Sequence, residues 1–478
     1  MNEKKSAKTL INISKKTFLQ VTALLLALLL ISVALTYFVP KGEFGLLPNG
    51  ETNYLEYIPR GDLAGISPLR GLLAPVLVFF SSDGPTLLVL SLFLFTISAA
   101  FQVMNDVGGI RALIGAVSAR FSERRALLLV LIAFLFYSFG SFLGLFEEML
   151  TMLPIVTALC VLIGFDSFTG FICCILACGF GFAGAVTNPF TVLLASEIIG
   201  VNPMEHIGYR ILIFLVMFVL LLAFLALYLK RLKKNPSASL TAAHDEKLRA
   251  SAASILEGAR GGENEKKLRR IYAIFLLTAL VLIVALSLSK TLRGYTVVFL
   301  TAYFLLLGIA AGALACGDLR LVLKSFLNGL TGALPTIVFI ALAASIKYVF
   351  EEAGVLPTIV HQINLLIVGK SPVAVAFVIY LIVLLLEFFI SSSTAKAILV
   401  MGLLAMVNTG LSKPMLVLLY TFADGYTNVL FPTSPVLLIS LSMIEMDYFG
   451  WVRKSAPLFA VNFLLVLLFI ALGVVFGY

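Results

Sequence analysis

The sequence predicts an all-α polytopic membrane protein built from two inverted repeats, and three observations lead to this prediction. Of the 478 residues, 61% are hydrophobic and 12% are charged, whereas soluble domains are only roughly 45–50% apolar. Stretches apolar enough to cross a bilayer, about 20 residues long, recur from residue 18 to residue 477. Finally, one pattern of polar residues occurs twice, once in each half of the chain. Together these features exclude a soluble globular domain.

The repeated pattern is a polar cluster followed by a proline break. Residues 145–154 read LFEEMLTMLP and residues 187–189 read TNP, while residues 390–396 read ISSSTAK and residues 433–435 read TSP. The second break begins 246 positions after the first. In lipid, broken backbone is tolerated only where it lines a protein-buried or water-filled site. Paired interruptions in the two halves are the best sequence indication of a transporter binding site.

The first half begins with a basic segment, residues 1–16, which the positive-inside rule places in the cytoplasm. We expect the first membrane repeat to cover residues 17–229. Its apolar run Phe18–Phe38 is longer than a signal-peptide core of roughly 7–15 residues and is therefore expected to be the first helix. The acidic stretch 40–66 suits the outside. Leu69–Phe80 is too short to cross and is expected to lie flat, before a span at about 84–104 and a basic turn.

Residues 126–163 allow two interpretations. They form either two ordinary crossings or, as we prefer, a re-entrant hairpin that enters from the cytoplasm with its tip near 141–148. The next stretch, 168–199, is expected to cross as a helix broken at the TNP sequence, because proline removes a backbone donor and kinks a helix. A span at about 209–229 returns to the cytoplasm.

Residues 230–270 are the only long hydrophilic stretch, and we expect a solvated cytoplasmic linker there. Residues 271–478 then supply a linking helix and the second repeat. The expected elements are spans at about 271–289, 296–316 and 332–350, a surface helix at 354–364, a hairpin at about 372–410, a broken helix at about 415–445 and a last span at about 456–477. The linking helix, 271–289, reverses the orientation of the second copy.

The candidate substrate- and ion-binding residues come from the two clusters, the two breaks and the apolar helix before the second break. They are Glu147, Glu148, Thr187, Asn188, Pro189, Ser391, Ser392, Ser393, Thr394, Lys396, Asp424, Asn428, Thr433 and Ser434. A charge at a helix centre costs about 2.5–3.5 kcal/mol on insertion scales. Charged residues in apolar sequence therefore indicate a site that binds ions or solutes.

Each candidate also has an alternative reading. The two glutamates could bind a cation, a proton or a substrate amine, or they could sit in a wet loop between two crossings. The serines could bind Na⁺ through their hydroxyls, or form a plain turn whose Lys396 reaches the surface. Asp424 is either functional or a buried charge paired with Lys347 or Lys396. Glu387, just before the second cluster, is a further and weaker candidate.

Several function classes are excluded by composition. The five cysteines lie in apolar runs and the three histidines are scattered, so no metal-ligand spacing occurs. The net charge of +9 comes from the N-terminus and one hydrophilic loop, which argues against a nucleic-acid partner. The glycines at 179–184 lack the preceding strand and following Lys-Ser/Thr of a nucleotide loop. No ATP-binding motif is found, and we expect neither an enzyme nor a cofactor, only a coupling ion, Na⁺ or H⁺.

At these residues the sequence resembles the YfcC-type branch of the C4-dicarboxylate anaerobic carrier (DcuC-like) family. The similarity rests on FEEMLTMLP at 146–154, GFGFAGAVTNPF at 179–190 and FADGYTNVLFPTSP at 422–435. The family belongs to the ion transporter superfamily. The resemblance implies two inverted repeats, each with a re-entrant hairpin and a broken helix, an elevator-type motion and a homodimer.

The resemblance also implies where ions and substrate bind. One ion site would join Glu147–Met149 to Thr187 and Asn188, and the other would join Ser391–Thr394 to Thr433 and Ser434, with the substrate between them. The implied metal ion is Na⁺. Related proteins with known cation sites often carry Ser-Asn-Thr at the tips, whereas this chain has Glu-Glu and Ser-Ser-Ser-Thr. YfcC-type proteins are commonly described as basic amino acid antiporters, while the wider family carries C4-dicarboxylates.

We therefore predict a secondary active transporter, a symporter or antiporter, of a small carboxylate-bearing solute in the inner (cytoplasmic) membrane, with its N-terminus in the cytoplasm. Acidic candidates outnumber the one nearby base, which favours a zwitterionic or a basic amino acid. A C4-dicarboxylate carrier is the alternative. An intramembrane enzyme with paired carboxylates and a passive channel are remote alternatives.

Overall fold

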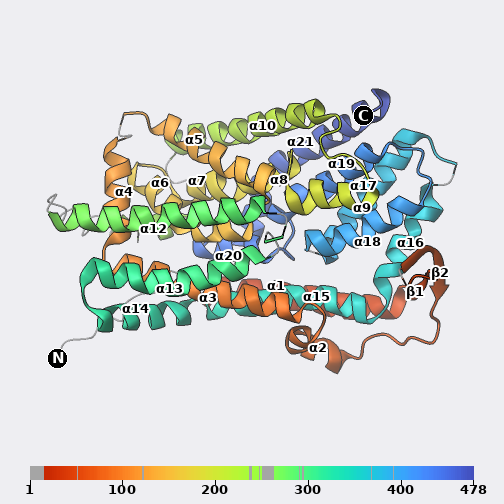
Figure 1. Cartoon of the computed structure of the whole chain (residues 1–478), viewed down its shortest axis with the longest axis horizontal. Helices are drawn as coiled ribbons and strands as arrows, with labels where there is room; N and C mark the ends of the chain where they lie inside the picture. Colours follow the sequence, from red (N-terminus) through yellow and green to blue (C-terminus); the bar gives the residue numbers. More distant parts are fainter. Residues whose placement is uncertain are drawn as a thin grey trace.

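The computed structural model is an elongated helical bundle in which most helices run along the long axis (Figure 1). It describes residues 15–50, 52–120, 123–235, 239–246, 248–249, 263–289, 291–292, 295–367, 369–390 and 392–478. Within these ranges, nine helices are long and apolar enough to cross a membrane. The prediction of a polytopic helical membrane protein is confirmed at this level.

The first half of the chain contains the following elements. They are α1 (Lys15–Phe38), β1 (Gly42–Leu46), β2 (Thr52–Pro59), α2 (Pro68–Leu77), η1 (Val78–Phe80), α3 (Gly84–Asp106), α4 (Gly109–Arg120), α5 (Arg125–Ser138), η2 (Phe139–Leu143), η3 (Glu147–Thr151), α6 (Leu153–Leu162), α7 (Ser167–Phe171), η4 (Ile172–Leu176), α8 (Ala177–Ala183), η5 (Pro189–Leu193), α9 (Leu194–Ile199) and α10 (Ile207–Lys234).

The second half repeats much of this order. Its elements are α12 (Glu263–Leu288), α13 (Thr296–Cys316), α14 (Leu319–Gly332), α15 (Leu334–Glu352), α16 (Val355–Ile367), α17 (Pro372–Phe389), α18 (Ser393–Met406), α19 (Lys413–Gly425), η8 (Tyr426–Val429), α20 (Pro435–Met443) and α21 (Tyr448–Val475). In both halves a helical pair (α5–α6, α17–α18) precedes an interrupted helix (α7–α9, α19–α20). A 28-residue helix then closes each half.

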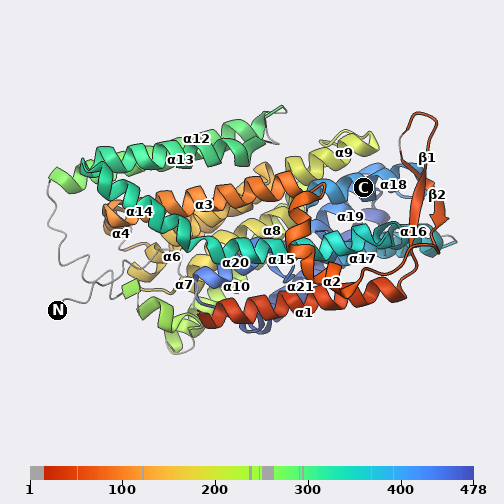
Figure 2. The ribbon, with the colours of Figure 1, turned by 90° about the horizontal axis from the view of Figure 1, so that it is seen from below.

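The two helical pairs open at opposite ends of the molecule. Helices α4 and α6 lie at one end, which we call the α4 end, and α16, α18 and the β-sheet lie at the other, the α16 end (Figures 1 and 2). At the α4 end, Arg125 Nη1 donates to the Ile163 carbonyl at 2.9 Å. The start of α5 and the end of α6 therefore meet. At the α16 end, strand β2 packs against both α16 and α18.

The first helices of each half pack on a helix of the other half. Helices α1 and α2 lie against α15, and α13 and α14 lie against α3. Side chains larger than hydrogen do not fit at these crossings: a Cβ on Gly308 or Gly312 would meet Ala100 or Val103 of α3, and one on Gly329 would meet the α3 backbone. Small residues that let helices approach closely are typical of membrane interfaces. The two halves therefore pack tightly against each other through these helices.

The all-α prediction missed a two-stranded antiparallel sheet, β1–β2, in the acidic stretch 40–66. The sheet is fixed to α16, since the Tyr57 hydroxyl lies 2.7 Å from Thr358 Oγ1 and the Gly42 amide donates to the Gly354 carbonyl at 3.0 Å. Two short strands in charged sequence are not stable alone. Their formation depends on this contact with α16, about 300 residues away in the chain, which local sequence cannot reveal.

Two further helices were missed, and part of the linker packs against the rest of the protein. Helix α4 occupies the expected basic turn, and α14 fills the gap between the spans expected at 296–316 and 332–350. Asp318 caps α14 by accepting the Arg320 and Leu321 amides at 2.9 and 3.2 Å. In the linker, Thr241 and Asp245 are buried, whereas four of the residues 239–246 are exposed. The solvated character of residues 230–270 stays a prediction.

Candidate functional site

Three charged side chains meet at the second polar cluster. Glu387 lies in the last turn of α17, Lys396 in the first turn of α18 and Asp424 near the end of α19. The Lys396 ammonium forms ion pairs with both carboxylates, and its Nζ is 2.7 Å from Asp424 Oδ1. All three residues are buried, with 3% exposure or less. Of the two partners considered for Asp424, Lys396 is the one found, whereas Lys347 pairs with Asp83 at 2.6 Å.

A hydrogen-bond network orients the Asp424 carboxylate. Ser393 Oγ donates to Asp424 Oδ2 at 2.9 Å, and Asn428 Nδ2 donates to the Asp424 carbonyl at 2.7 Å. The Tyr420 hydroxyl donates to the Ser393 carbonyl, which ties α19 to the start of α18. Sequence reasoning missed Tyr420, because an aromatic residue inside an apolar helix carries no signal of this contact.

The remaining hydroxyls of the second tip have different surroundings. Ser392 and Thr394 are exposed, and Ser392 Oγ caps α18 by accepting the Ala395 amide at 3.3 Å. Ser391 lies outside the described residues. Among the described residues of the tip, Ser393 contributes its hydroxyl to the charged cluster.

The second break faces this tip. Between η8 and α20, the Phe431 ring packs against Phe388 of α17 with the ring centroids 5.6 Å apart. Thr433 and Ser434 are buried, and Thr433 Oγ1 has no hydrogen-bond partner among the described residues. Pro435 begins α20. A buried hydroxyl without a partner, on broken backbone, is available to a ligand.

The first tip and the first break are joined by direct hydrogen bonds. Asn188 Nδ2 donates to the Gly140 carbonyl at 3.0 Å, and Thr187 Oγ1 donates to the Phe142 carbonyl at 3.2 Å. Asn188 Oδ1 also accepts the Phe190 and Thr191 amides and so caps η5, which begins at Pro189. The TNP sequence thus has a structural role: it holds the tip of the α5–α6 pair.

The two adjacent glutamates lie in the 3₁₀ turn η3, between that tip and α6. Glu148 is 5% exposed and its Oε2 atom has no hydrogen-bond partner in the described structure, while Glu147 is half-buried. The described residues provide neither carboxylate with a salt bridge. Turn η3 packs against α20, which begins at the second break. The turn with the two glutamates therefore lies beside the helix that follows the second break.

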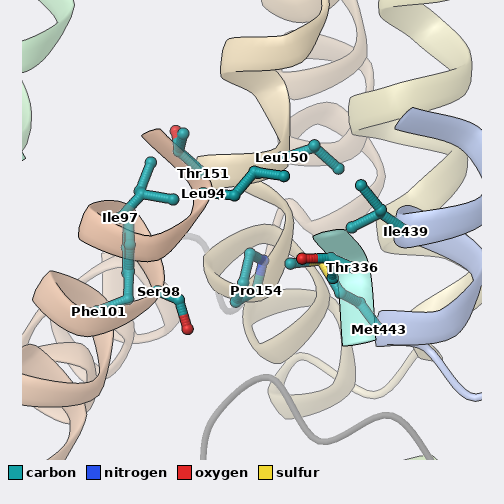
Figure 3. Close-up of a pocket in the computed structure, with 10 residues that line it drawn as sticks. All are labelled: Leu94, Ile97, Ser98, Phe101, Leu150, Thr151, Pro154, Thr336, Ile439 and Met443. Carbon is teal, nitrogen blue, oxygen red and sulfur yellow. The ribbon is translucent and has the colours of Figure 1, made fainter. Parts of the chain in front are cut away.

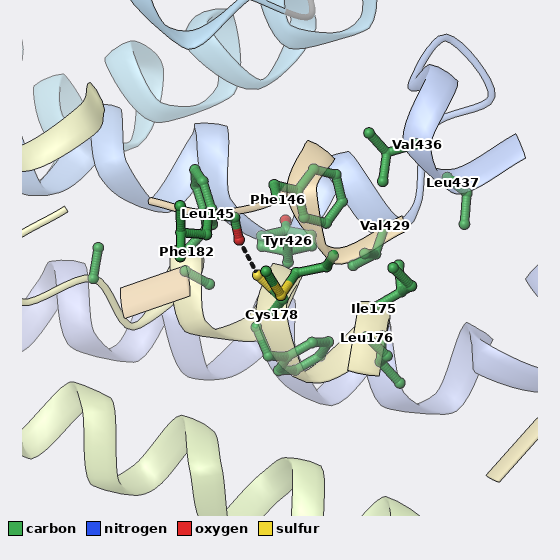
Figure 4. Packing of buried hydrophobic residues seen from close by; sticks show 14 of the residues in the cluster. Leu145, Phe146, Ile175, Leu176, Cys178, Phe182, Tyr426, Val429, Val436 and Leu437 are labelled. Carbon is green, nitrogen blue, oxygen red and sulfur yellow. Dashed lines mark hydrogen bonds between the residues drawn. The ribbon is translucent and has the colours of Figure 1, made fainter. Parts of the chain in front are cut away.

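The two halves approach closely where these groups lie (Figure 4). Phe146 and Phe182 pack together beside Tyr426 and Val429 of η8. Cys178 Sγ donates to the Leu145 carbonyl at 2.5 Å. A Cβ on Gly425 would overlap the Ala183 backbone of α8. The first tip is thus packed against the end of α19, close to Asp424.

An apolar crevice borders η3 on the side facing α3 (Figure 3). Its lining residues come from α3, η3, α6, α15 and α20, and they include the hydroxyls of Ser98, Thr151 and Thr336. Thr151 Oγ1 is buried and lacks a hydrogen-bond partner within the described ranges. Sequence reasoning did not single out Thr151, although it lies in the same FEEMLTMLP sequence as the glutamates.

The described residues contain no group of three or more His, Cys, Asp or Glu side chains that could hold a metal ion. Asn188 Oδ1 and Ser392 Oγ cap helices. All five expected Na⁺ ligands, Thr187, Asn188, Ser392, Thr433 and Ser434, stay predictions.

The chain has relatives among known proteins. A protein of Escherichia coli (strain K12) named "Putative basic amino acid antiporter YfcC" is 25% identical over 392 residues, covering 78% of this chain and 75% of the relative. An uncharacterized protein of Haemophilus influenzae is 23% identical over 369 residues, covering 77% of this chain and 71% of the relative.

Two solved transporter structures also align with the chain. The Neisseria gonorrhoeae protein MtrF, described with a class of antimetabolite efflux pumps, gives a TM-score of 0.44 at 15% identity, covering 98% of this chain and 96% of that one. The Alcanivorax borkumensis YdaH transporter gives 0.45 at 14%, covering 96% and 99%. The sequence profile of DcuC, the C4-dicarboxylate anaerobic carrier, matches residues 18–475. The chain therefore belongs to the C4-dicarboxylate anaerobic carrier family of membrane transporters.

Proposed function

We propose that the protein is a secondary active transporter that exchanges a small amino acid, and a basic one in particular, across the inner membrane. The observation that carries this proposal is the charge balance at the two tips. In the described part of the chain, three buried carboxylates (Glu148, Glu387 and Asp424) and the half-buried Glu147 lie there with a single base, Lys396. An excess of buried negative charge is stabilised by a cationic ligand.

The substrate carboxylate needs a different partner. Helix α18 begins at the second tip and α20 begins at the second break. Helix N-termini stabilise anions through their free amide groups. The ammonium of Lys396, in the first turn of α18, adds a positive charge near one of these helix starts. An amino acid could thus place its carboxylate at these helix starts and its cationic group among the carboxylates.

The arrangement of the two helical pairs favours inverted repeats. The α5–α6 pair opens at the α4 end and the α17–α18 pair at the α16 end, so their tips point toward each other from opposite faces. We infer that both pairs are re-entrant hairpins in the bilayer, with the N-terminus in the cytoplasm, that the protein is a homodimer, and that transport follows an elevator-type motion. Glu147 and Glu148 are the residues at which a coupling proton or cation would bind.

A C4-dicarboxylate is the second candidate substrate, because the family is named for such solutes. Two carboxylates on the substrate would meet one buried base and four acids, which the charge balance opposes. The related YfcC protein, by its name, favours the basic amino acid.

Exchange in proteoliposomes distinguishes these substrates. Vesicles loaded with unlabelled arginine are given labelled arginine outside, and ornithine, succinate and fumarate are added as competitors. The proposal predicts arginine uptake that ornithine inhibits and succinate does not. Inhibition by succinate and fumarate without inhibition by ornithine would identify a dicarboxylate carrier instead.

A further inference from the structure

The position of Lys396 is unfavourable for an ordinary structural lysine. It lies in the first turn of α18, where the helix dipole disfavours a positive charge. It is also fully buried, and burying an ammonium carries a large desolvation penalty. Neither the helix dipole nor solvation therefore stabilises a lysine at this position. The groups in contact with its ammonium must stabilise it.

Those partners place three oxygens around the ammonium. The ammonium has three donors, and three oxygens surround it: a carboxylate oxygen of Glu387, Asp424 Oδ1 at 2.7 Å and the Ile390 carbonyl at 3.4 Å. The Ile390 carbonyl is free because α17 ends at Phe389. Carboxylate and carbonyl oxygens are the donors that hard metal cations also prefer.

The lysine also joins three elements. Glu387 belongs to the first arm of the pair, Lys396 to the second arm and Asp424 to the interrupted helix. Without a cation between them, the two buried carboxylates would repel one another. The first tip offers a contrast, because within the described residues Glu147 and Glu148 have no basic partner.

We propose that the Lys396 ammonium is a tethered cation, which occupies between Glu387 and Asp424 the position that a free monovalent cation would otherwise take. The second tip is consequently assembled without an ion from solution, and any coupling ion acts at the first tip. This inference rests on the proposed transport function for its place in the cycle. It predicts that removing the ammonium creates a site for a dissolved cation.

The test measures melting temperature in detergent, in NaCl or KCl against N-methylglucamine chloride of equal ionic strength. A ligand that binds only the folded state raises the melting temperature. The wild-type difference between the salts is the baseline, because an ion bound at the first tip acts equally on wild type and variants, and every gain is counted beyond it. Lys396→Met, which keeps the length of the side chain without its charge, should gain several degrees in NaCl or KCl. The control Lys396→Met/Asp424→Asn should lose that gain.

A second variant covers the case in which Lys396→Met does not fold. Lys396→Met/Glu387→Gln removes one charge of each sign and leaves Asp424 as the single carboxylate, so its buried net charge equals that of the wild type. It should show the same salt response, abolished by adding Asp424→Asn. Variants that respond to the salts as wild type does would overturn the proposal. No transport substrate is present, so failure of the proposed substrate would leave this result intact.

Discussion

The two tips differ in whether their buried carboxylates have a basic partner. Lys396 neutralises part of the acid at the second tip, at 2.7 Å from Asp424. At the first tip, Glu148 Oε2 has no partner in the part of the chain that the structure describes. A buried carboxylate without a basic partner gains most from binding a proton or a cation. The pH dependence of transport should therefore arise at the first tip.

Substituting the first-tip glutamates tests this assignment. Glu148→Gln keeps the shape of the side chain but can no longer bind a proton, so the pH profile of arginine exchange should flatten. Glu147→Gln should do the same to a smaller degree, because Glu147 is only half-buried. Exchange rates measured across a pH series check this. A Glu148→Gln profile that matches the wild type would remove Glu148 from coupling.

Two neighbouring serines at the second tip should differ in effect. Ser393→Ala removes the hydroxyl that donates to Asp424 at 2.9 Å, and we expect a higher KM for exchange with little change in melting temperature. Ser392→Ala removes the cap of α18, which costs about 1 kcal/mol of stability and should leave KM unchanged. Equal effects of the two substitutions on KM would show that Ser393 has no special role.

Residue pairing was predictable only in part. The sequence offered two bases for Asp424, and it could not choose between them because the choice depends on which helices pack together. Lys347 lies on α15 at the α16 end, beside Asp83, whereas Lys396 begins α18. Glu387 received less weight than its contact with Lys396 warrants, since nothing in the local sequence indicates that α17 ends beside α19.

At the scale of elements, close approach of α8 and α19 brings the two tips together. Gly425 allows this, because a Cβ there would overlap the backbone of Ala183. Overpacking of this kind costs roughly 1–3 kcal/mol. Gly425→Ala should therefore lower the melting temperature and reduce exchange.

Gly208→Ala is the matched control for that substitution. A Cβ at Gly208, in the first turn of α10, meets no atom within 4 Å. Alanine at such a helical position is neutral or stabilising, by about 0.4–1 kcal/mol. Should both alanine variants melt at the same temperature, the crossing of α8 and α19 would not be as tight as described.

Long apolar helices were the most predictable elements. The span expected at about 84–104 corresponds to α3, Gly84–Asp106, and the one at about 209–229 to α10, Ile207–Lys234. A helix that crosses the lipid bilayer needs a long run of apolar residues. Such a run is easily recognised in the sequence. Helix α14 carries Arg320 and Lys324 and was missed, because a helix charged on one face does not resemble a span.

For the whole molecule, the linker is more than a tether between the halves. Asp245 accepts the Ser167 amide at 2.9 Å and the Thr241 hydroxyl at 2.9 Å. Asp166 accepts hydrogen bonds from Ser239, at 2.8 Å, and from Tyr228 of α10. Residues 239–246 are therefore fixed to the start of α7, at the α4 end.

Substituting adjacent acids of the linker tests that contact. Asp245→Ala leaves two buried donors without an acceptor, at a cost of about 1–3 kcal/mol, and should lower the melting temperature. Glu246→Ala changes an exposed carboxylate and should have no such effect. If Asp245→Ala melts like Glu246→Ala, the docked arrangement of the linker is incorrect.

The most direct test of substrate binding between the two tips is counterflow in proteoliposomes loaded with unlabelled arginine, with labelled arginine outside. We expect transient accumulation of label above equilibrium in the wild type and in Glu246→Ala, and loss of this accumulation in Asp424→Asn. Labelled succinate in succinate-loaded vesicles provides the same test for the alternative substrate. Counterflow of either solute that is unchanged by Asp424→Asn would contradict substrate binding between the tips.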